Sequence, residues 1–163
     1  MCSSQCWLTA GAILAGLAVA AGALGAHQLD RHFHEKYAGR VYEKKVTIEG
    51  REQILPVPLA QKHLADFKTG AEYQMYHGLA LLAVGLVAQS RPGRRLSIAG
   101  ACFVAGSLGF SGGLYAYALT DLKWIGIFIV PIGGILFLTG WIAFAAAVCP
   151  CGKMTNHSHA RNL

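Results

Sequence analysis

Polar side chains that could bind a ligand or carry protons occur within apolar stretches of this 163-residue chain. Tyr73 and His77 are four residues apart, so on a helix they share one face, and Gln74 lies beside them. An imidazole can transfer protons or bind a ligand, and phenols can orient it. The full candidate cluster is His27, Tyr73, Gln74, His77, Ser111 and Tyr115. The alternative, which we favour, is that these groups hydrogen-bond between helices and fix their packing.

Cysteine and histidine residues near the two ends of the chain are a second candidate for chemistry. Thiolate and imidazole ligands suit Cu(I) or Zn(II). The weak candidate ligands are Cys2, Cys6, Cys149, Cys151, His157 and His159. Cys149 and Cys151 form a CxC pair rather than a CxxC pair, and the tail over residues 149–163 is expected to be flexible. We therefore favour a protein with no metal site and no cofactor.

Sequence motifs of the common enzyme classes are missing. The chain has no P-loop, GxSxG elbow, HExxH motif or dinucleotide fingerprint. We therefore expect a protein that is not an enzyme. The net charge of +6 could suggest nucleic-acid binding, but the basic residues flank apolar stretches. Anionic lipid headgroups, not nucleic acids, are the expected partner.

Four apolar stretches, at about residues 7–29, 69–88, 96–118 and 124–148, would position these groups. A helix of roughly 20 apolar residues spans a hydrocarbon core of about 30 Å. The composition agrees, because 54% of the residues are hydrophobic and only 13% are charged. The sequence therefore predicts an all-α integral membrane protein. Its single domain, residues 1–148, would be an antiparallel bundle of four helices at about 7–29, 59–88, 96–118 and 124–148.

The connection between the first two helices, at about residues 30–58, is the expected extramembrane part. Val46-Thr47-Ile48 and Gln53-Ile54-Leu55 flank a polar tetrapeptide, a pattern that fits a short β-hairpin. Pro56-Val57-Pro58 is expected to break regular structure, and Pro58 suits the first turn of the second helix. This topology predicts that the polar cluster lies in one leaflet, towards the first connection, and that the opposite half is nearly all apolar.

Small residues at regular spacing predict close helix contacts. Gly16 and Gly22 each belong to a ladder of small residues in the first helix, Gly109 and Gly113 form a GxxxG pair, and Pro131 precedes Gly133 and Gly134. We expect packing seams within the bundle at the glycines and a kink at the proline. The alternative for the ladders is a dimer interface, so a homo-oligomer stays open.

Five blocks of sequence resemble the successive signatures of the domain of unknown function 423 family, small membrane proteins that include transmembrane protein 256. The blocks are GALGAH at 22–27, TGAEYQMYH at 69–77, FSGGLY at 110–115, PIGG at 131–134 and GW at 140–141. The resemblance implies a four-helix protein of bacterial inner or mitochondrial membranes without an established activity. The first connection looks longer than is usual in that family, so it is either a partner-binding insertion or a passive one.

Three hypotheses on function follow from the sequence. The first is a noncatalytic, multi-pass protein of the cell inner (cytoplasmic) membrane that acts by association, as an accessory subunit, through residues 30–68. The second is a small transporter or ligand-binding protein that uses the His, Tyr and Gln cluster. The third is a metal-handling protein that uses the terminal cysteines and histidines.

Overall fold

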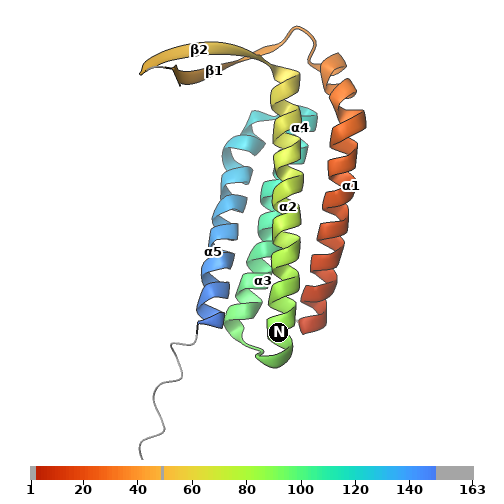
Figure 1. Ribbon diagram of the computed structural model, residues 1–163, viewed down its shortest axis with the longest axis vertical. Coiled ribbons are helices and arrows are strands. Elements are labelled where there is room, and N and C mark those ends of the chain that lie inside the picture. Colours follow the sequence, from red (N-terminus) through yellow and green to blue (C-terminus); the bar gives the residue numbers. More distant parts are fainter. Residues whose placement is uncertain (1–2, 49, 150–163) are drawn as a thin grey trace, which may run out of the picture.

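The computed structural model describes residues 3–48 and 50–149, and it consists of helices in two antiparallel pairs with a β-hairpin at one end (Figure 1). The first pair is formed by α1 (Ser4–Lys36) and α2 (Leu59–Ser90). Strands β1 (Val41–Ile48) and β2 (Arg51–Pro58) connect these two helices and pair with each other. The structure is therefore mostly helical and carries the predicted hairpin.

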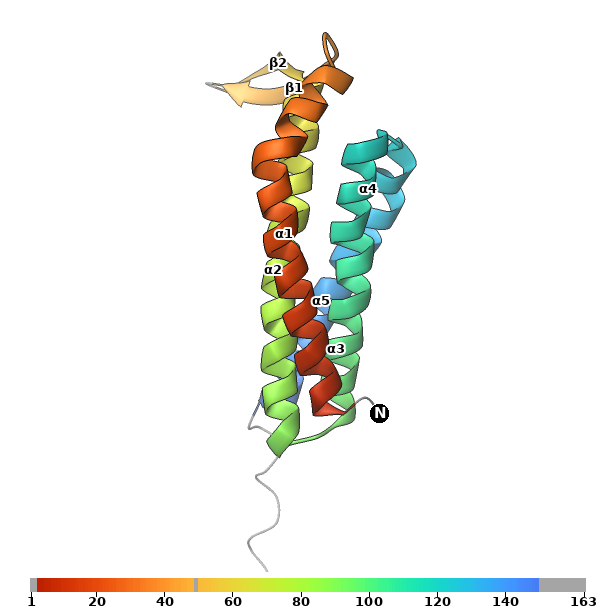
Figure 2. The same cartoon turned by 90° about the vertical axis from the view of Figure 1, so that its right-hand side faces the viewer.

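Each rod of the second pair contains a π-helical segment. The first rod is α3 (Arg94–Gly106), η1 (Ser107–Ser111) and α4 (Gly112–Thr120), which follow one another without a break. The second is η2 (Ile125–Ile129) and α5 (Val130–Val148). Figure 2 shows the α1–α2 pair beside the α3–α4 rod, closest at the end that carries the N-terminus and diverging towards the hairpin.

Among the described residues, three helical segments are long and apolar enough to cross a membrane: Ser4–Ala26, Arg94–Thr120 and Ile125–Val148. Most of their outward side chains are apolar, and Phe128 and Ile142 are 62% and 71% exposed. The fourth expected span, in α2, is not among the three. Gln74 and His77 in the middle of that helix lower its mean hydropathy, although both side chains are buried in the bundle.

The first helix is longer than the sequence predicted. It continues past residue 29 to Lys36, so the start of the expected extramembrane connection is helical. Leu29, Phe33 and Tyr37 continue an apolar face at four-residue spacing, and all three pack in one core cluster with the first turns of α2. This packing extends the helix beyond its apolar span.

The hairpin is also longer than predicted, and the expected break at Pro56-Val57-Pro58 is wrong. The strands pair from Val41 with Pro58 to Ile48 with Arg51. The Leu59 N–H donates to the Arg40 carbonyl at 2.9 Å, which is one of the two bonds of a hydrogen-bonded pair at this register. Such pairs alternate along an antiparallel ladder, so Pro56 and Pro58 fall at positions whose missing N–H would face away from β1. Both prolines therefore fit the strand.

Two apolar clusters form the core, one towards each end of the bundle. The cluster at the N-terminal end of α1 includes Trp7, Leu81, Val84, Leu96, Phe103 and Phe137. The cluster beneath the hairpin includes Phe33, Tyr37, Leu59, Ala60, Phe67 and Ala118. The buried polar residues Gln74, Ser111 and His77 belong to neither cluster. The core is therefore divided along its length by a polar layer.

Glycines bring the helices of each pair together, but not all at the expected positions. A Cβ on Gly78 would lie 2.9 Å from the Ala15 nitrogen, and one on Gly113 would lie 3.0 Å from a methyl group of Val130. A Cβ on Gly16 or on Gly22 would meet no atom of another helix within 4 Å. The packing seam expected at Gly16 and Gly22 is therefore wrong, because the face of α1 that meets α2 is carried by Gly11, Ala15, Ala18 and Gly25.

The contact between η1 and α5 is made by backbone. A Cβ on Gly133 would overlap the Phe110 nitrogen and lie 2.7 Å from the Gly109 carbonyl carbon. A Cβ on Gly134 would make only an ordinary contact, at 3.7 Å, with the Phe110 ring. Pro131 stands in the first turn of α5, directly after η2. Since proline has no N–H, the α-helical hydrogen bond to the Ile127 carbonyl is lost where the π-helical turn ends.

Candidate functional site

The polar layer is built around Gln74, which joins three helices. Its amide nitrogen donates to the Leu14 carbonyl of α1 at 2.9 Å, and its amide oxygen accepts from the Tyr115 hydroxyl of α4 at 3.1 Å. The structure therefore brings together two members of the candidate cluster, Gln74 and Tyr115. Both polar groups of the buried amide have partners, as burial away from water requires.

His77 connects α2 to α5 and is held as the neutral form. Its Nδ1 lies 2.7 Å from the Tyr73 carbonyl, which can only accept, so Nδ1 carries the proton. Its Nε2 lies 3.2 Å from the Trp141 indole N–H, which can only donate, so Nε2 is unprotonated. The ring stacks on Phe137 with 3.4 Å between centroids and 6° between planes. The two partners assign the tautomer, and they occupy both nitrogens.

The other members of the candidate cluster differ in position. The Ser111 Oγ is buried and has no hydrogen-bond partner among the described residues. The Tyr73 side chain is 40% exposed and its ring packs 4.8 Å from that of Phe110, so only its carbonyl takes part in the layer. The side chain of His27 lies outside the part of the chain that the structure describes.

The structure spreads the cluster along the bundle and does not gather it at the end next to the hairpin. Gln74 bonds to Leu14, in the middle of the α1 span, and His77 bonds to Trp141, which the sequence placed in the opposite half of the bilayer. About 15 residues separate Gln74 from the start of α2, or about 22 Å of helix. The polar groups therefore form a layer through the middle of the bundle rather than a patch near one surface.

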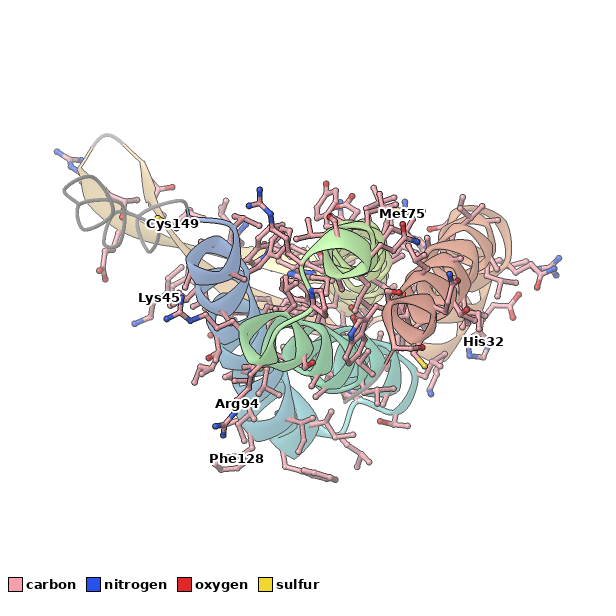
Figure 3. The ribbon with its side chains drawn as sticks, turned by 90° about the horizontal axis from the view of Figure 1, so that it is seen from below. His32, Lys45, Met75, Arg94, Phe128 and Cys149 are labelled. Carbon is pink, nitrogen blue, oxygen red and sulfur yellow. The ribbon has the colours of Figure 1, made fainter. Side chains whose placement is uncertain are left out.

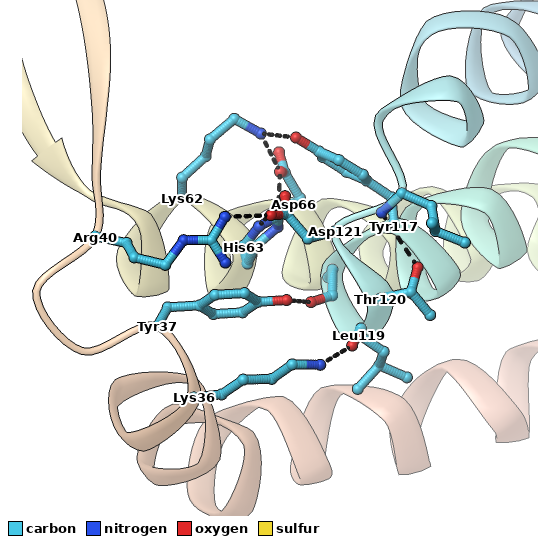
Figure 4. Close-up of polar contacts among 12 residues, drawn as sticks. Lys36, Tyr37, Arg40, Lys62, His63, Asp66, Tyr117, Leu119, Thr120 and Asp121 are labelled. Carbon is cyan, nitrogen blue, oxygen red and sulfur yellow. Dashed lines mark hydrogen bonds and ion pairs between the residues drawn. The ribbon is translucent and has the colours of Figure 1, made fainter.

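A second polar cluster, which we call the hairpin-base cluster, lies where the hairpin joins the bundle (Figure 4). Its members are Tyr37, Arg40, Lys62, His63, Asp66, Tyr117 and Asp121. Asp121 follows α4 with φ of 59°, the one non-glycine residue with positive φ among those described. Aspartate tolerates this left-handed conformation better than most residues, and its N–H bonds to the Tyr117 carbonyl at 2.8 Å.

The Asp121 carboxylate receives two donors from different elements. Arg40 donates to Oδ2 at 2.6 Å, and His63 lies 3.2 Å from Oδ1. Burial alone would raise the pKa of Asp121, but the hydrogen bond and charge of Arg40, together with His63, lower it below its usual value. The carboxylate is therefore held ionised, and it ties the chain before β1 to the link after α4.

His63 is fully buried beside this carboxylate. Burial lowers its pKa, the charge of Lys62 lowers it further, and the attraction of Asp121 is the smaller effect. The Nδ1 atom has no hydrogen-bond partner among the described residues and lies 4.0 Å from the Asp66 carboxylate. The imidazole is therefore neutral at pH 7 and packs 4.6 Å from the Tyr37 ring, between centroids.

Lys62 and Tyr37 complete the hairpin-base cluster. Lys62 donates to Asp66 at 2.7 Å and to the Tyr117 hydroxyl at 3.1 Å. The Tyr37 hydroxyl donates to the Ala118 carbonyl at 2.9 Å, and burial raises the pKa of this phenol. The neighbouring Lys36 donates to the Leu119 carbonyl. These bonds join the end of α1 and the start of α2 to α4.

An open cavity of about 560 Å³ lies beside the hairpin-base cluster. Its lining includes Arg40, Tyr42, Lys62, Tyr117, Lys123 and Ile127. Asp66 and Asp121, which also line it, are paired with Lys62 and Arg40. Lys123 has no ion pair among the described residues, so the cavity carries an excess of positive charge over an apolar wall.

The terminal cysteines and histidines form no site that the structure describes. Cys6 and Cys149 are exposed, while Cys2, Cys151, His157 and His159 lie outside the described residues. Within residues 3–48 and 50–149, no three His, Cys, Asp or Glu residues come together in a way that could hold a metal ion.

Reasoning from the sequence missed the hairpin-base cluster. Its residues come from segments far apart in the chain, so spacing could not bring them together. Two local signals were available. Lys62 and Asp66 have the i,i+4 spacing of a helical ion pair, and Asp121 stands in a short link directly after a helix, where aspartate often adopts positive φ.

Comparison with known proteins gives a consistent result. Residues 21–134 match the family described as protein of unknown function (DUF423). The chain is 37% identical over 137 residues to a UPF0382 membrane protein of Staphylococcus aureus (strain bovine RF122 / ET3-1), which covers 84% of this chain and 89% of the relative. It is 33% identical over 138 residues to a Bacillus subtilis UPF0382 membrane protein, covering 84% and 90%. A Haemophilus influenzae UPF0382 membrane protein is 47% identical over 88 residues, covering 53% and 68%. No solved structure matches the chain.

Proposed function

The chain belongs to the DUF423 family of membrane proteins, and from that premise we propose that it acts without catalysis, as an accessory subunit that holds a partner protein at the membrane through its hairpin. The observation that carries the proposal is the free outer edge of β1. Within residues 3–48 and 50–149 the hairpin is the whole of its sheet, so each of its strands pairs on one side only. An unpaired strand edge is a template for a strand of another chain.

The two edges of the hairpin are not equivalent. The nitrogens of Pro56 and Pro58 face outwards from the hairpin. Because proline has no N–H, the edge of β2 lacks two hydrogen-bond donors. The residues of β1 that alternate in the same way are Val41, Glu43, Lys45 and Thr47, and each keeps its N–H. A partner strand would therefore add to β1 rather than to β2.

The base of the hairpin is held firmly enough to present that edge. A two-stranded hairpin alone is marginally stable in water. Here Arg40 pairs with Asp121 just before β1, and Leu59 bonds to the Arg40 carbonyl just after β2. The hairpin extends outwards past α5 when the bundle is viewed along its length (Figure 3). This position leaves its outer end accessible to a neighbouring protein.

We further propose that α2 is a fourth crossing and that the protein is a multi-pass component of the cell inner membrane. Gln74 and His77, which lower the hydropathy of α2, direct their polar atoms to Leu14, Tyr115 and Trp141 within the bundle. Satisfied polar groups are the condition for a helix in hydrocarbon. The exposed Leu79 and Leu86 leave an apolar outer face on the same helix.

A noncatalytic role agrees with the chemistry of the polar layer. His77 is the one histidine in that layer whose side chain the structure describes, and its two nitrogens are both engaged, by Tyr73 and Trp141. A proton-transfer role would require breaking one of these bonds. The layer therefore supports the packing interpretation, in which its polar groups fix how the helices meet.

The edge of β1 can be tested by proline substitution. Lys45→Pro removes an outward N–H and leaves the ladder between β1 and β2 intact, whereas Lys45→Ala changes the side chain and keeps the N–H. The variants would be purified in mild detergent from the native membrane, with a photo-crosslinker at Thr47. We expect a stoichiometric crosslinked partner with wild-type and Lys45→Ala, and its loss with Lys45→Pro. A monomer without a crosslinked protein in every case would overturn the proposal.

A further inference from the structure

The pairing register of the hairpin separates its side chains into two faces. Neighbouring residues on a strand point to opposite sides of the sheet, and paired residues point to the same side. One face carries Tyr42, Lys44, Val46, Arg51, Gln53, Leu55 and Val57. The other carries Val41, Glu43, Lys45, Thr47, Glu52, Ile54, Pro56 and Pro58. We call these the proximal face and the distal face.

The proximal face points towards the bundle end. Tyr42, Lys44 and Val57 line one pocket with Ala65 and Asp66, which lie further along α2 than the hairpin does. The Lys62 ammonium lies 5.5 Å from the centre of the Tyr42 ring. Helix α2 runs from the hairpin into the bundle. The hairpin side chains that contact Lys62, Ala65 and Asp66 therefore point along α2, towards the bundle and the membrane.

With the candidate span Arg94–Thr120 placed across the hydrocarbon core, the hairpin would lie at the height of the lipid headgroups. His63 bonds to Asp121, directly after the membrane-spanning segment Arg94–Thr120, and Pro58 precedes His63 by about 8 Å of helix. The headgroup layer on each side of a hydrocarbon core is about 5–7 Å thick. The hairpin projects sideways from the helices rather than continuing their direction (Figure 1). Its eight-residue strands extend about 27 Å across this level.

The two faces differ in charge. The proximal residues include Lys44 and Arg51 and no acid, while the distal residues include Glu43 and Glu52 with Lys45. Apolar side chains beside the two cations, at Val46, Leu55 and Val57, suit the boundary between headgroups and acyl chains. The cavity beneath the hairpin adds Lys123, which has no ion pair in the described part of the chain, to the same side. A surface of this kind is complementary to anionic lipid.

From the register, the position and the charge together, we propose that the hairpin is a surface arm whose proximal face binds the anionic phospholipid headgroups of the bilayer that contains the helices. The arm would then orient the β1 edge along the membrane plane. The proposal is independent of the partner protein proposed above, because it concerns the side chains of one face rather than the backbone edge of β1, and it requires only lipid.

The test uses two matched pairs of variants in nanodiscs that contain no other protein. In a background with all native cysteines replaced by serine, Gln53→Cys on the proximal face and Thr47→Cys on the distal face each carry a bimane fluorophore. Quenching by lipids with a nitroxide on the headgroup reports contact with the bilayer surface. Discs of phosphatidylcholine alone are compared with discs containing phosphatidylglycerol.

We expect strong quenching at position 53, weak quenching at position 47, and a larger effect at 53 in the anionic discs. A basic residue near an anionic surface should raise the equilibrium constant for docking of the arm about fivefold. Lys44→Glu should therefore lower that constant by at least this factor and weaken the quenching at position 53 in the anionic discs. Lys45→Glu, with the same charge change on the distal face, should not. Equal quenching at both positions, equal quenching in both lipids, or equal effects of the two charge reversals would each overturn the proposal.

Discussion

His63 illustrates how one buried residue can link stability to pH. It lies between the Asp121 and Asp66 carboxylates, yet burial and Lys62 keep its pKa below the ordinary value of 6.5. Protonation therefore costs more in the folded protein than in the unfolded chain. Below pH 6.5 the unfolded chain takes up a proton that the folded protein does not, so stability falls.

We therefore predict that the purified protein loses thermal stability as the pH is lowered from 7.5 to 5. One group can contribute at most about 1.4 kcal/mol per pH unit. His63→Gln should make the dependence shallower, whatever it does to stability at pH 7.5. The lowered pKa of Asp121 acts in a separate window, below 3.8, where its protonation also removes stability. Melting curves of both proteins across this pH range would show the effect, and identical slopes would contradict it.

Members of the polar layer could be predicted from the sequence, but most of their hydrogen-bond partners could not. Gln74 and Tyr115 do meet, because polar side chains within apolar spans have few alternatives to one another. The Leu14 carbonyl and the Trp141 indole could not be predicted as partners. These contacts depend on how far the helices are shifted along one another, and residue spacing within one helix does not determine that shift.

At the scale of the elements, hydropathy and spacing predicted the helices, while packing sets their ends and contacts. The hairpin was predicted from its pattern of apolar and polar residues, but its length depends on where the prolines fall in the hydrogen-bond ladder. Glycine spacing in the first helix suggested Gly16 and Gly22 as contacts, whereas Gly11 and Gly25 meet α2. Spacing identifies ladders of small residues but not which ladder faces the neighbouring helix.

The contact between η1 and α5 yields a prediction on neighbouring glycines. Gly133→Ala would place a methyl group against the backbone of Gly109 and Phe110, and Gly134→Ala would add one in ordinary contact with a ring. Both changes gain the same helix propensity, so their difference reports the steric effect. Gly133→Ala should destabilise the protein by about 1–3 kcal/mol relative to Gly134→Ala. Thermal unfolding in one detergent compares them, and equal stability would contradict the backbone contact.

At the scale of the whole molecule, the arrangement of the ends follows from the number of crossings. The N-terminal end of α1, the link between α2 and α3 and the end of α5 all lie at one end of the bundle, and the hairpin and the link after α4 lie at the other (Figure 1). If α2 spans the membrane with the three more apolar segments, these two groups of loops face different compartments. If α2 does not span, the hairpin and the link between α2 and α3 share a compartment.

Cysteine labelling distinguishes the two topologies. In the cysteine-free background, single cysteines would replace Ser3 and Ser90 at one end and Thr47 and Lys123 at the other, all exposed positions. The reagent is a maleimide that does not cross membranes. In intact spheroplasts, we expect it to label both positions at one end of the bundle and neither position at the other end. All four should label once the membrane is permeabilised. Labelling of Thr47 and Ser90 from the same side would exclude α2 as a crossing, and it would place the polar layer of Gln74 and His77 outside the hydrocarbon core.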